Sequence, residues 1–203
     1  MVKILTESNK RAAAVLSDMN SPLGEGVGGV LEVIDAIEVL QGKESRLRDL
    51  ALLIAGKIIS LAKKVSPETG ASEAQKLLRD GSALGKFREM IAAQGGSLDL
   101  FDPEYRSGIL SHVAGRVVSP KGGWIKWMDC VRIGRIAREF EEWGGEGMFV
   151  YPKVGSRVEK GAELVTLYGD SPVSEEILAA LGECFRITEE ETAPNPLVYE
   201  IVE

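Results

Sequence analysis

The sequence predicts an α/β part followed by an α+β part, and three observations support this. A short continuous apolar run at residues 12–16 lies between charged and polar residues and indicates one buried strand. Apolar residues then recur at helical spacing as far as residue 94, and after a turn-rich stretch the pattern changes to short strands. We therefore expect helices packed on a sheet fragment over residues 1–98 and a small α+β module over residues 99–203.

The first half begins with the apolar run Ala12-Ala13-Ala14-Val15-Leu16, which favours a strand of a parallel sheet because such strands are buried on both faces. Helices are expected at 29–40, 45–64, 71–79 and 82–94, with Gly42, Pro67 and Gly95-Gly96 as stop signals. Two of these helices have a continuous apolar face that we expect to be buried, with Ser82 as the N-cap of the second. The faces comprise Leu47, Leu50, Leu53, Ile54, Ile58 and Leu61 in one helix, and Leu84, Phe87, Met90 and Ile91 in the other.

The second half alternates short strands with two helices. Strands are expected at 113–118, 124–128, 148–151, 164–168, 185–187 and 198–202, because β-branched and aromatic residues there are bounded by turn residues. Apolar spacing predicts helices at 130–143 and 174–181. The boundary between the two halves is placed in the polar stretch 99–107.

Composition excludes several classes of function. The net charge of −7 argues against a nucleic-acid partner, which needs a basic face. Two cysteines and one histidine, His112, are too few for a disulfide framework or a zinc site. No apolar run approaches the roughly 20 residues that span a bilayer, and the N-terminus lacks a signal-peptide pattern. A cytoplasmic protein with small-molecule or protein partners, without a membrane, is expected.

The glycine-rich segment Gly24-Glu25-Gly26-Val27-Gly28-Gly29 matches the dinucleotide-binding pattern G-x-G-x-x-G. Seven residues separate it from the preceding strand, however, and another helix follows instead of a second strand. We favour the alternative that these glycines let a helix N-terminus pack closely against the sheet.

Three longer segments carry a family resemblance. They are Asp18-Met19-Asn20-Ser21-Pro22-Leu23-Gly24 with the glycines and helix after it, residues 81–96 ending in Ala-Gln-Gly-Gly, and the stretches 113–118, 133–138 and 151–164. Their order resembles the pyrimidine-nucleoside phosphorylases, the family of thymidine phosphorylase and archaeal AMP phosphorylase. The resemblance covers about residues 12–170 and implies the C-terminal half of such an enzyme, with a barrel-sandwich-like C-terminal module.

The resemblance implies phosphorolysis of nucleosides or nucleotides, a glycosyl transfer of pyrimidine metabolism. The family's phosphate- and nucleoside-binding motifs occur nowhere in this sequence, so no catalytic or cofactor-binding residue is assigned and the chain alone is expected to be inactive. A separate N-terminal phosphorylase polypeptide is the implied partner, and a homodimer is compatible with the resemblance. No cofactor is required, but the family also implies a structural potassium or calcium ion, held here by the carbonyls of Leu23 and Gly26 and the carboxylate of Asp35.

Two alternatives from other functional classes stay open. One is a free-standing, non-catalytic binding or assembly module derived from this family. The other is a biotinyl- or lipoyl-like carrier, because Val154-Gly155 to Leu164 is similar to a turn of those domains. A carrier needs a modified lysine in a characteristic hairpin, and neither Lys121 nor Lys126 lies in such a motif. His112, which no nucleophile motif accompanies, is expected to be structural.

Overall fold

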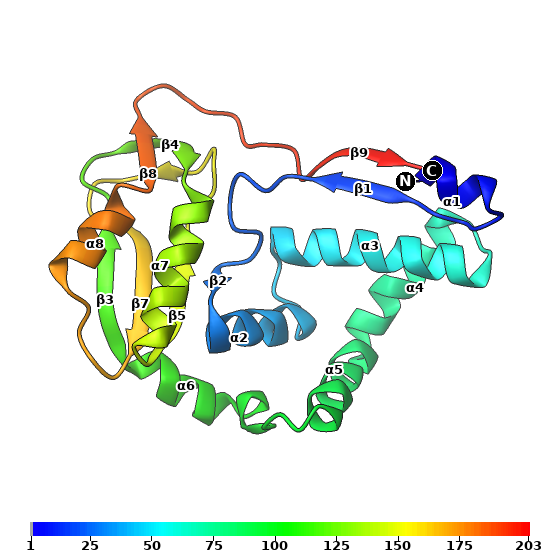
Figure 1. The fold of residues 1–203 in the computed structure, drawn as a ribbon, viewed down its shortest axis with the longest axis horizontal. Coiled ribbons are helices and arrows are strands. Elements are labelled where there is room, and N and C mark those ends of the chain that lie inside the picture. The colour runs from blue at the N-terminus through cyan, green and yellow to red at the C-terminus, as the bar shows by residue number, and fades with distance from the viewer. Residues whose placement is uncertain (1) are drawn as a thin grey trace. The chain divides into compact units, whose positions relative to one another are not determined.

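The computed structural model describes residues 2–203, in which a run of successive helices in the first half is followed by short strands with a few helices between them (Figure 1). The helices are α1 (Val2–Glu7), α2 (Gly29–Leu40), α3 (Arg46–Lys63), α4 (Pro67–Arg79), α5 (Ser82–Ala93), the 3₁₀ helix η1 (Asp99–Phe101), α6 (Pro103–Ser111), α7 (Cys130–Glu142) and α8 (Glu175–Gly182). The strands are β1 (Ala14–Ser17), β2 (Gly26–Val27), β3 (Val113–Val118), β4 (Gly123–Met128), β5 (Gly145–Val150), β6 (Arg157–Val158), β7 (Glu163–Gly169), β8 (Phe185–Thr188) and β9 (Val198–Val202).

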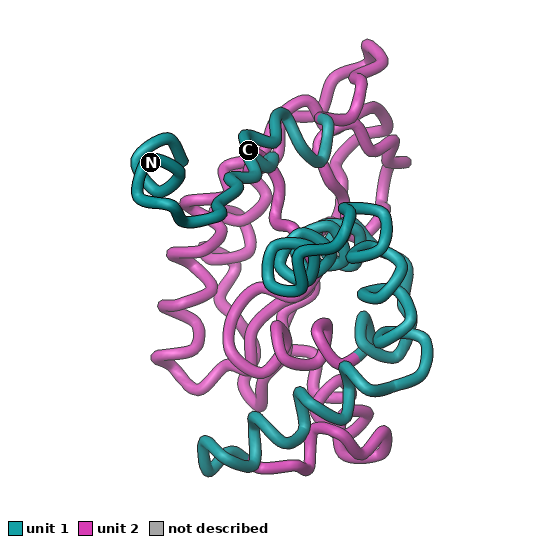
Figure 2. The backbone as a smooth tube through the Cα atoms, turned by 90° about the vertical axis from the view of Figure 1, so that its right-hand side faces the viewer, with its two compact units in different colours: residues 1–18, 38–96, 196–203 teal, residues 19–37, 97–195 magenta. Residues whose placement is uncertain are grey.

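The chain divides into two compact units (Figure 2). Unit 1 comprises Met1–Asp18, Glu38–Gly96 and Pro196–Glu203, and unit 2 comprises Met19–Ile37 and Ser97–Asn195. Two segments belong to a different unit than in the predicted domains 1–98 and 99–203. The loop and helix start after Asp18 belong with the second half of the chain, and the last strand belongs with the first.

Unit 1 is built on the helix pair α3 and α4, which approach closely at two glycines. A Cβ atom on Gly70 would lie 2.3 Å from the backbone oxygen of Gly56, and one on Gly56 would lie 2.9 Å from the Cα of Ala71. Side chains larger than hydrogen would therefore push the helices apart. Ser45 caps α3 by accepting a hydrogen bond from Arg48 N–H, and Ser66 caps α4 in the same way through Thr69 N–H.

Besides these helices, unit 1 contains a two-stranded antiparallel sheet formed by β1 and β9. In it, Ala14 pairs with Val202 and Leu16 with Glu200. The predicted parallel sheet around residues 12–16 is therefore wrong, because the partner strand comes from the far end of the chain and runs the other way. The strand is also not fully buried, since Leu16 is 45% exposed. A short apolar run marks a strand but carries no information about its partner.

Unit 2 contains two antiparallel sheets. One has the order β2-β5-β7-β3 and the other β6-β4-β8. The inner strand β7 pairs with β3 on one side and β5 on the other, and Leu164, Val165 and Leu167 are almost completely buried. The barrel-sandwich-like arrangement that the family resemblance implies for this module stays a prediction.

The core of unit 2 is closed by two of its helices. Ile133, Ala137 and Phe140 of α7 pack into the same cluster as Met148 and Val150 of β5. The α8 helix contributes Leu181 to this cluster. On the other side of the sheet, Leu31 and Ile34 of α2 form a second cluster with Phe149 and Tyr168.

Several predicted boundaries are confirmed, and some local interpretations are wrong. Helix 29–40 and strands 113–118 and 198–202 have the predicted bounds. Pro67 was predicted as a stop signal, but it lies in the first turn of the next helix, α4. The N-cap of α5 is Gly81 and not the predicted Ser82. The polar stretch before residue 111 contains helix α6, whose start is capped by the Asp102 carboxylate. No helix within residues 2–203 combines the length and apolarity needed to cross a bilayer.

The largest difference concerns burial in unit 1. No residue of α5 is buried, and Met90, expected inside, is 44% exposed. On α3, Leu50 is buried as expected, but Ile54 and Ile58 are exposed. Periodicity correctly predicted that these residues lie on helix faces. Within residues 2–203, however, no other element covers these faces.

Candidate functional site

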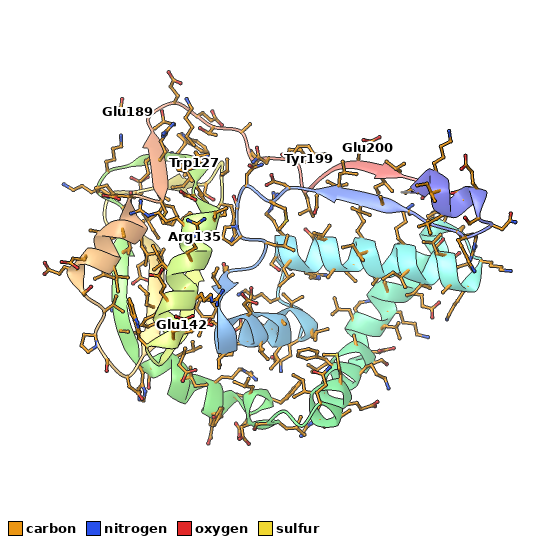
Figure 3. The ribbon with its side chains drawn as sticks, in the orientation of Figure 1. Trp127, Arg135, Glu142, Glu189, Tyr199 and Glu200 are labelled. Atoms are coloured by element: carbon orange, nitrogen blue, oxygen red, sulfur yellow. The ribbon has the colours of Figure 1, made fainter. Side chains whose placement is uncertain are left out.

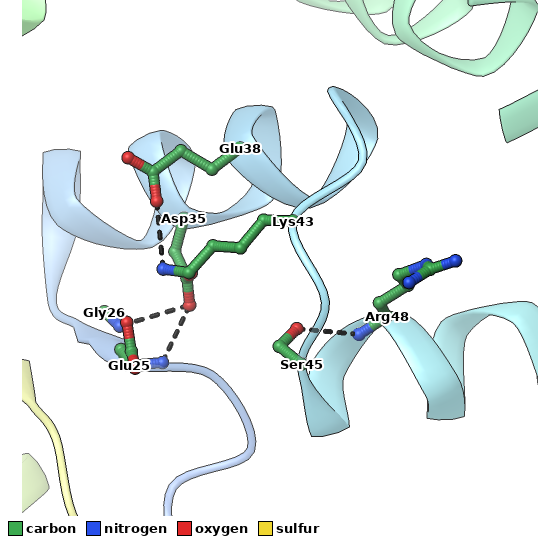
Figure 4. Close-up of polar contacts among 7 residues, drawn as sticks. All are labelled: Glu25, Gly26, Asp35, Glu38, Lys43, Ser45 and Arg48. Atoms are coloured by element: carbon green, nitrogen blue, oxygen red, sulfur yellow. Dashed lines mark hydrogen bonds and ion pairs between the residues drawn. The ribbon is translucent and has the colours of Figure 1, made fainter. Parts of the chain in front are cut away.

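The glycine-rich loop in front of α2 is held by the carboxylate of Asp35, which lies almost two turns into that helix. One oxygen of Asp35 accepts hydrogen bonds from the backbone N–H groups of Glu25 (2.8 Å) and Gly26 (3.2 Å) (Figure 4). Asp35 is only 2% exposed, so these bonds form in a poorly hydrated environment. A buried carboxylate that receives two backbone donors fixes the loop against its own helix.

Two positions of this loop favour glycine, Gly26 because of the backbone beside it and Gly28 because of its positive φ. A Cβ atom on Gly26 would lie 2.4 Å from the backbone oxygen of Leu31, and one on Gly28 would lie 2.1 Å from a carboxylate oxygen of Glu141. Gly28 also has a φ of +90°, which favours glycine. The glycines therefore allow a close approach of the loop to α2 and α7, which is the packing role expected from the sequence.

The same loop is tied to the segment after β5. The ammonium group of Lys153 donates hydrogen bonds to the carbonyls of Gly24 (2.5 Å) and Val150 (3.1 Å). Ser21 is buried, and its hydroxyl oxygen accepts a hydrogen bond of 2.9 Å from the N–H of Val154. The loop is thus held by a cation on one side and by a carboxylate on the other.

These contacts argue against a phosphate cradle in the loop. A dinucleotide-binding loop presents its N–H groups to the phosphates. Here the N–H groups of Glu25 and Gly26 bind Asp35, and that of Gly28 binds Glu32 at 2.9 Å. The G-x-G-x-x-G match in this sequence therefore marks a packing loop.

The three predicted cation ligands, Leu23, Gly26 and Asp35, come from this loop and from the helix directly after it. The structure brings Gly26 and Asp35 into contact through a hydrogen bond from the Gly26 N–H. The Asp35 carboxylate thereby has a role that requires no metal, and the Lys153 ammonium supplies a positive charge at a loop carbonyl. The potassium or calcium site stays a prediction.

The contacts of Lys153 and Ser21 that hold this loop were not predicted from the sequence. The bonded groups lie 129 and 133 residues apart along the chain. Both segments were singled out for their motifs, but neither motif indicates that it contacts the other. Only the fold of unit 2 brings them together.

His112 lies at the end of α6, where its imidazole Nδ1 is 2.8 Å from a carboxylate oxygen of Asp170. Both side chains are largely exposed, and the nearby hydroxyl of Ser111 donates its hydrogen bond to the Gly108 carbonyl. No nucleophile is activated in this arrangement, which suits the structural role expected for His112.

Two groups in the core of unit 2 have shifted pKa values. Burial, together with a hydrogen bond to Tyr151, raises the pKa of the Tyr168 hydroxyl. Burial also raises the pKa of the Cys184 thiol, to about 11. Both shifts favour the neutral form, so neither residue is prepared as a nucleophile or base at neutral pH.

Comparison with curated proteins gives consistent matches along the whole chain. The pyrimidine-nucleoside phosphorylase of Bacillus subtilis is 30% identical over 218 residues, which covers 100% of this chain and 49% of the relative. The chain is a relative of the pyrimidine-nucleoside phosphorylases. The Geobacillus stearothermophilus enzyme of the same name is 29% identical over 98% of the chain and 48% of its own length, and the Staphylococcus haemolyticus enzyme is 28% identical. No protein-family model matches the chain.

The similarity confirms the resemblance seen in the motifs and fixes its extent. The chain spans about half the length of the pyrimidine-nucleoside phosphorylases that it matches. A match of about half is consistent with the C-terminal half that the order of the motifs predicts. The loop held by Asp35 and Lys153 lies within the matched region.

Proposed function

We propose that this chain forms the C-terminal portion of a pyrimidine-nucleoside phosphorylase-like glycosyltransferase. Such an enzyme would cleave the bond between base and sugar with phosphate, which requires a phosphate cradle and a group that stabilises the departing base. The motifs for those tasks are absent from this sequence. The proposed role is therefore to complete a two-part fold whose other half binds phosphate and nucleoside, and the chain alone is proposed to be inactive.

The apolar surface of unit 1 is the observation that supports this role best. Its helices expose Ile54 (40%) and Ile58 (60%) on α3 and Met90 (44%) on α5, where the sequence pattern demands burial. Full burial of one such side chain contributes about 1.5–3 kcal/mol. A covering polypeptide would therefore gain several kcal/mol from these residues.

The β1 and β9 pair adds a second feature suited to a partner. Within the described residues each strand pairs only with the other, so the sheet keeps open edges, and Leu16 on β1 is exposed. Open edges of this kind accept a further strand through backbone hydrogen bonds. The half of the phosphorylase fold that this sequence lacks would supply both the strand and the apolar cover.

The test is phosphate-dependent release of free base from thymidine, uridine and AMP. The purified chain would be assayed alone and mixed with the matching other half of the Bacillus subtilis relative. We expect no release by the chain alone, and complex formation with release in the mixture. Release by the chain alone would refute the inactivity, and a mixture without a complex would refute the two-part role.

Substitutions on α3 connect this outcome to the proposed surface. Ile54→Glu with Ile58→Glu places two charges on the exposed apolar face and should prevent the complex. Gln75→Glu, at an exposed position of α4, is the control and should leave the complex intact. Equal effects of both changes would show that the apolar face is not the contact surface.

One observation favours the alternative of a free-standing binding module. Unit 2 has a core of its own, in which residues from both sheets and two helices are buried together. This module would bind a partner without taking part in phosphorolysis. Stable folding of the chain as a monomer or homodimer, with no complex in the mixture, would favour it, while a mass increase on a lysine would indicate a carrier instead.

A further inference from the structure

Unit 2 contains a pocket of about 590 Å³ bordered by edge strands of its two sheets. Three consecutive residues of β3, Arg116 to Val118, and three of β8, Phe185 to Ile187, line it. Side chains alternate between the two faces of a strand, so three successive residues line one pocket only where the strand edge borders it. Accordingly, β3 and β8 are the outermost strands of their sheets.

The floor of this pocket is apolar. Val118, Leu178 and Ile187 line it with accessible apolar surface, and the lining residues Val117, Leu164 and Phe185 are each at least nine-tenths buried. A pocket of a few hundred Å³ with such a lining suits a small organic molecule, whose apolar body would displace water from it. Its position in the core module separates it from the glycine-rich loop, because none of the loop residues lines it.

The polar groups of the pocket all have the same sign. Its charged lining residues are Arg116, Lys121 and Arg186, and no lining residue is acidic, although acidic residues outnumber basic ones by 31 to 24 in the chain. Arg116 forms an ion pair with Glu163 at 2.9 Å. Within residues 2–203 neither Lys121 nor Arg186 forms an ion pair, so two positive charges at the pocket lack a carboxylate partner.

The Arg186 side chain contacts an aromatic ring that does not itself line the pocket. Its guanidinium lies 5.6 Å from the ring centre of Trp127 on the neighbouring strand β4. Trp127 is labelled in Figure 3. This contact orients the cation and leaves its N–H groups able to bind an anion.

We propose that this pocket binds an organic anion with an apolar body, such as a medium-chain carboxylate or alkyl phosphate. The apolar part would lie on Val118, Leu178 and Ile187, and the anionic group would face Lys121 and Arg186. The pocket is independent of the proposed phosphorylase role, because all the residues that form it belong to unit 2.

Calorimetric titration of the full chain with octanoate, octyl phosphate and octylammonium tests the charge requirement. We expect saturable binding of octanoate or octyl phosphate, and at least about tenfold weaker binding of octylammonium, which has the same chain with the opposite charge. The stronger of the two anions would identify the headgroup. Equal binding of anion and cation, or no saturation by any of the probes, would overturn the proposal.

Two kinds of variant test the position of the site. Lys121→Gln with Arg186→Gln should weaken binding of the anion about tenfold or more. Lys126→Gln with Lys160→Gln removes the same net charge at exposed positions outside the pocket and should leave binding unchanged. Equal weakening by both pairs would indicate a general effect of charge and would contradict a site.

The second kind of variant fills the pocket without changing charge. Gly182 lines the pocket on α8, and a Cβ atom there would make an ordinary contact of 3.7 Å with Val117. Gly182→Leu should therefore fold, extend into the cavity and abolish binding, with the thermal unfolding midpoint reporting that the fold is kept. Undiminished binding by this folded variant would refute the location.

Discussion

Replacing Asp35 with alanine tests whether the glycine-rich loop is held by this buried carboxylate. The change removes the acceptor for the N–H groups of Glu25 and Gly26, which bind it at 2.8 and 3.2 Å. Each buried donor left unsatisfied costs about 1–3 kcal/mol. Because water can reach these partly buried N–H groups after the substitution, we expect a total loss of roughly 2–4 kcal/mol from the free energy of unfolding.

Urea unfolding would measure this loss, and hydrogen exchange of the Glu25 and Gly26 amides would locate it. A chain of this size loses about 2–4 °C of melting temperature per kcal/mol, so Asp35→Ala should melt roughly 5–15 °C lower. Asp35→Asn keeps one acceptor oxygen without the charge and should lose about half as much. Glu139→Ala, at an exposed position of α7, is the control and should stay within about 0.5 kcal/mol of the parent protein.

A stability of Asp35→Ala equal to that of the control, with unchanged exchange of the two amides, would contradict an anchoring role of Asp35. The loop would then be held mainly by its other contacts, those of Lys153 and Ser21. A loss of stability without faster exchange at Glu25 and Gly26 would also contradict the proposed anchor. It would place the effect of the carboxylate elsewhere in the fold.

Three further predictions follow from single features of the structure. Gly70→Ala should destabilise the chain by about 1–3 kcal/mol in urea unfolding, because its Cβ would lie 2.3 Å from a backbone oxygen. The control Gly85→Ala lies inside α5, where a Cβ meets nothing within 4 Å, and should stabilise the chain by about 0.5–1 kcal/mol. Equal effects of the two substitutions would contradict the close contact between α3 and α4. Thiol labelling at pH 8 should modify the half-buried Cys130 and spare the buried Cys184, and rapid labelling of Cys184 in the native state would contradict its burial. Because the pKa of the Cys184 thiol is raised from 9.0 to about 11, the stability contributed by this thiol is present below pH 9 and is lost as the pH rises through 11. Addition of potassium or calcium should move the melting temperature by less than about 1 °C, since the Asp35 carboxylate already accepts hydrogen bonds from two N–H groups. A larger, saturable rise in melting temperature that is absent from Asp35→Ala would establish the cation site.

Local signals in the sequence were sufficient for most helices and strands. The helix at 29–40 and the strand at 113–118 have the bounds expected from apolar spacing and glycine stops, because these depend on neighbouring residues only. The motifs also identified the family, and the comparisons confirmed it. Leu23, Gly26 and Asp35 were predicted as cation ligands, which stays a prediction; the contact that the structure shows between Gly26 and Asp35 is a hydrogen bond from the loop N–H to the carboxylate.

The tertiary structure decided which segments meet and which apolar faces are covered. The partner of β1 is β9 from the far end of the chain, and Lys153 reaches the Gly24 carbonyl across 129 residues. Ile58 lies on a face that periodicity marks as buried, yet it is exposed, because burial requires a neighbouring element that spacing alone cannot supply. Spacing within a segment determines its helix or strand, whereas pairing, burial and the pocket between β3 and β8 depend on contacts between distant segments.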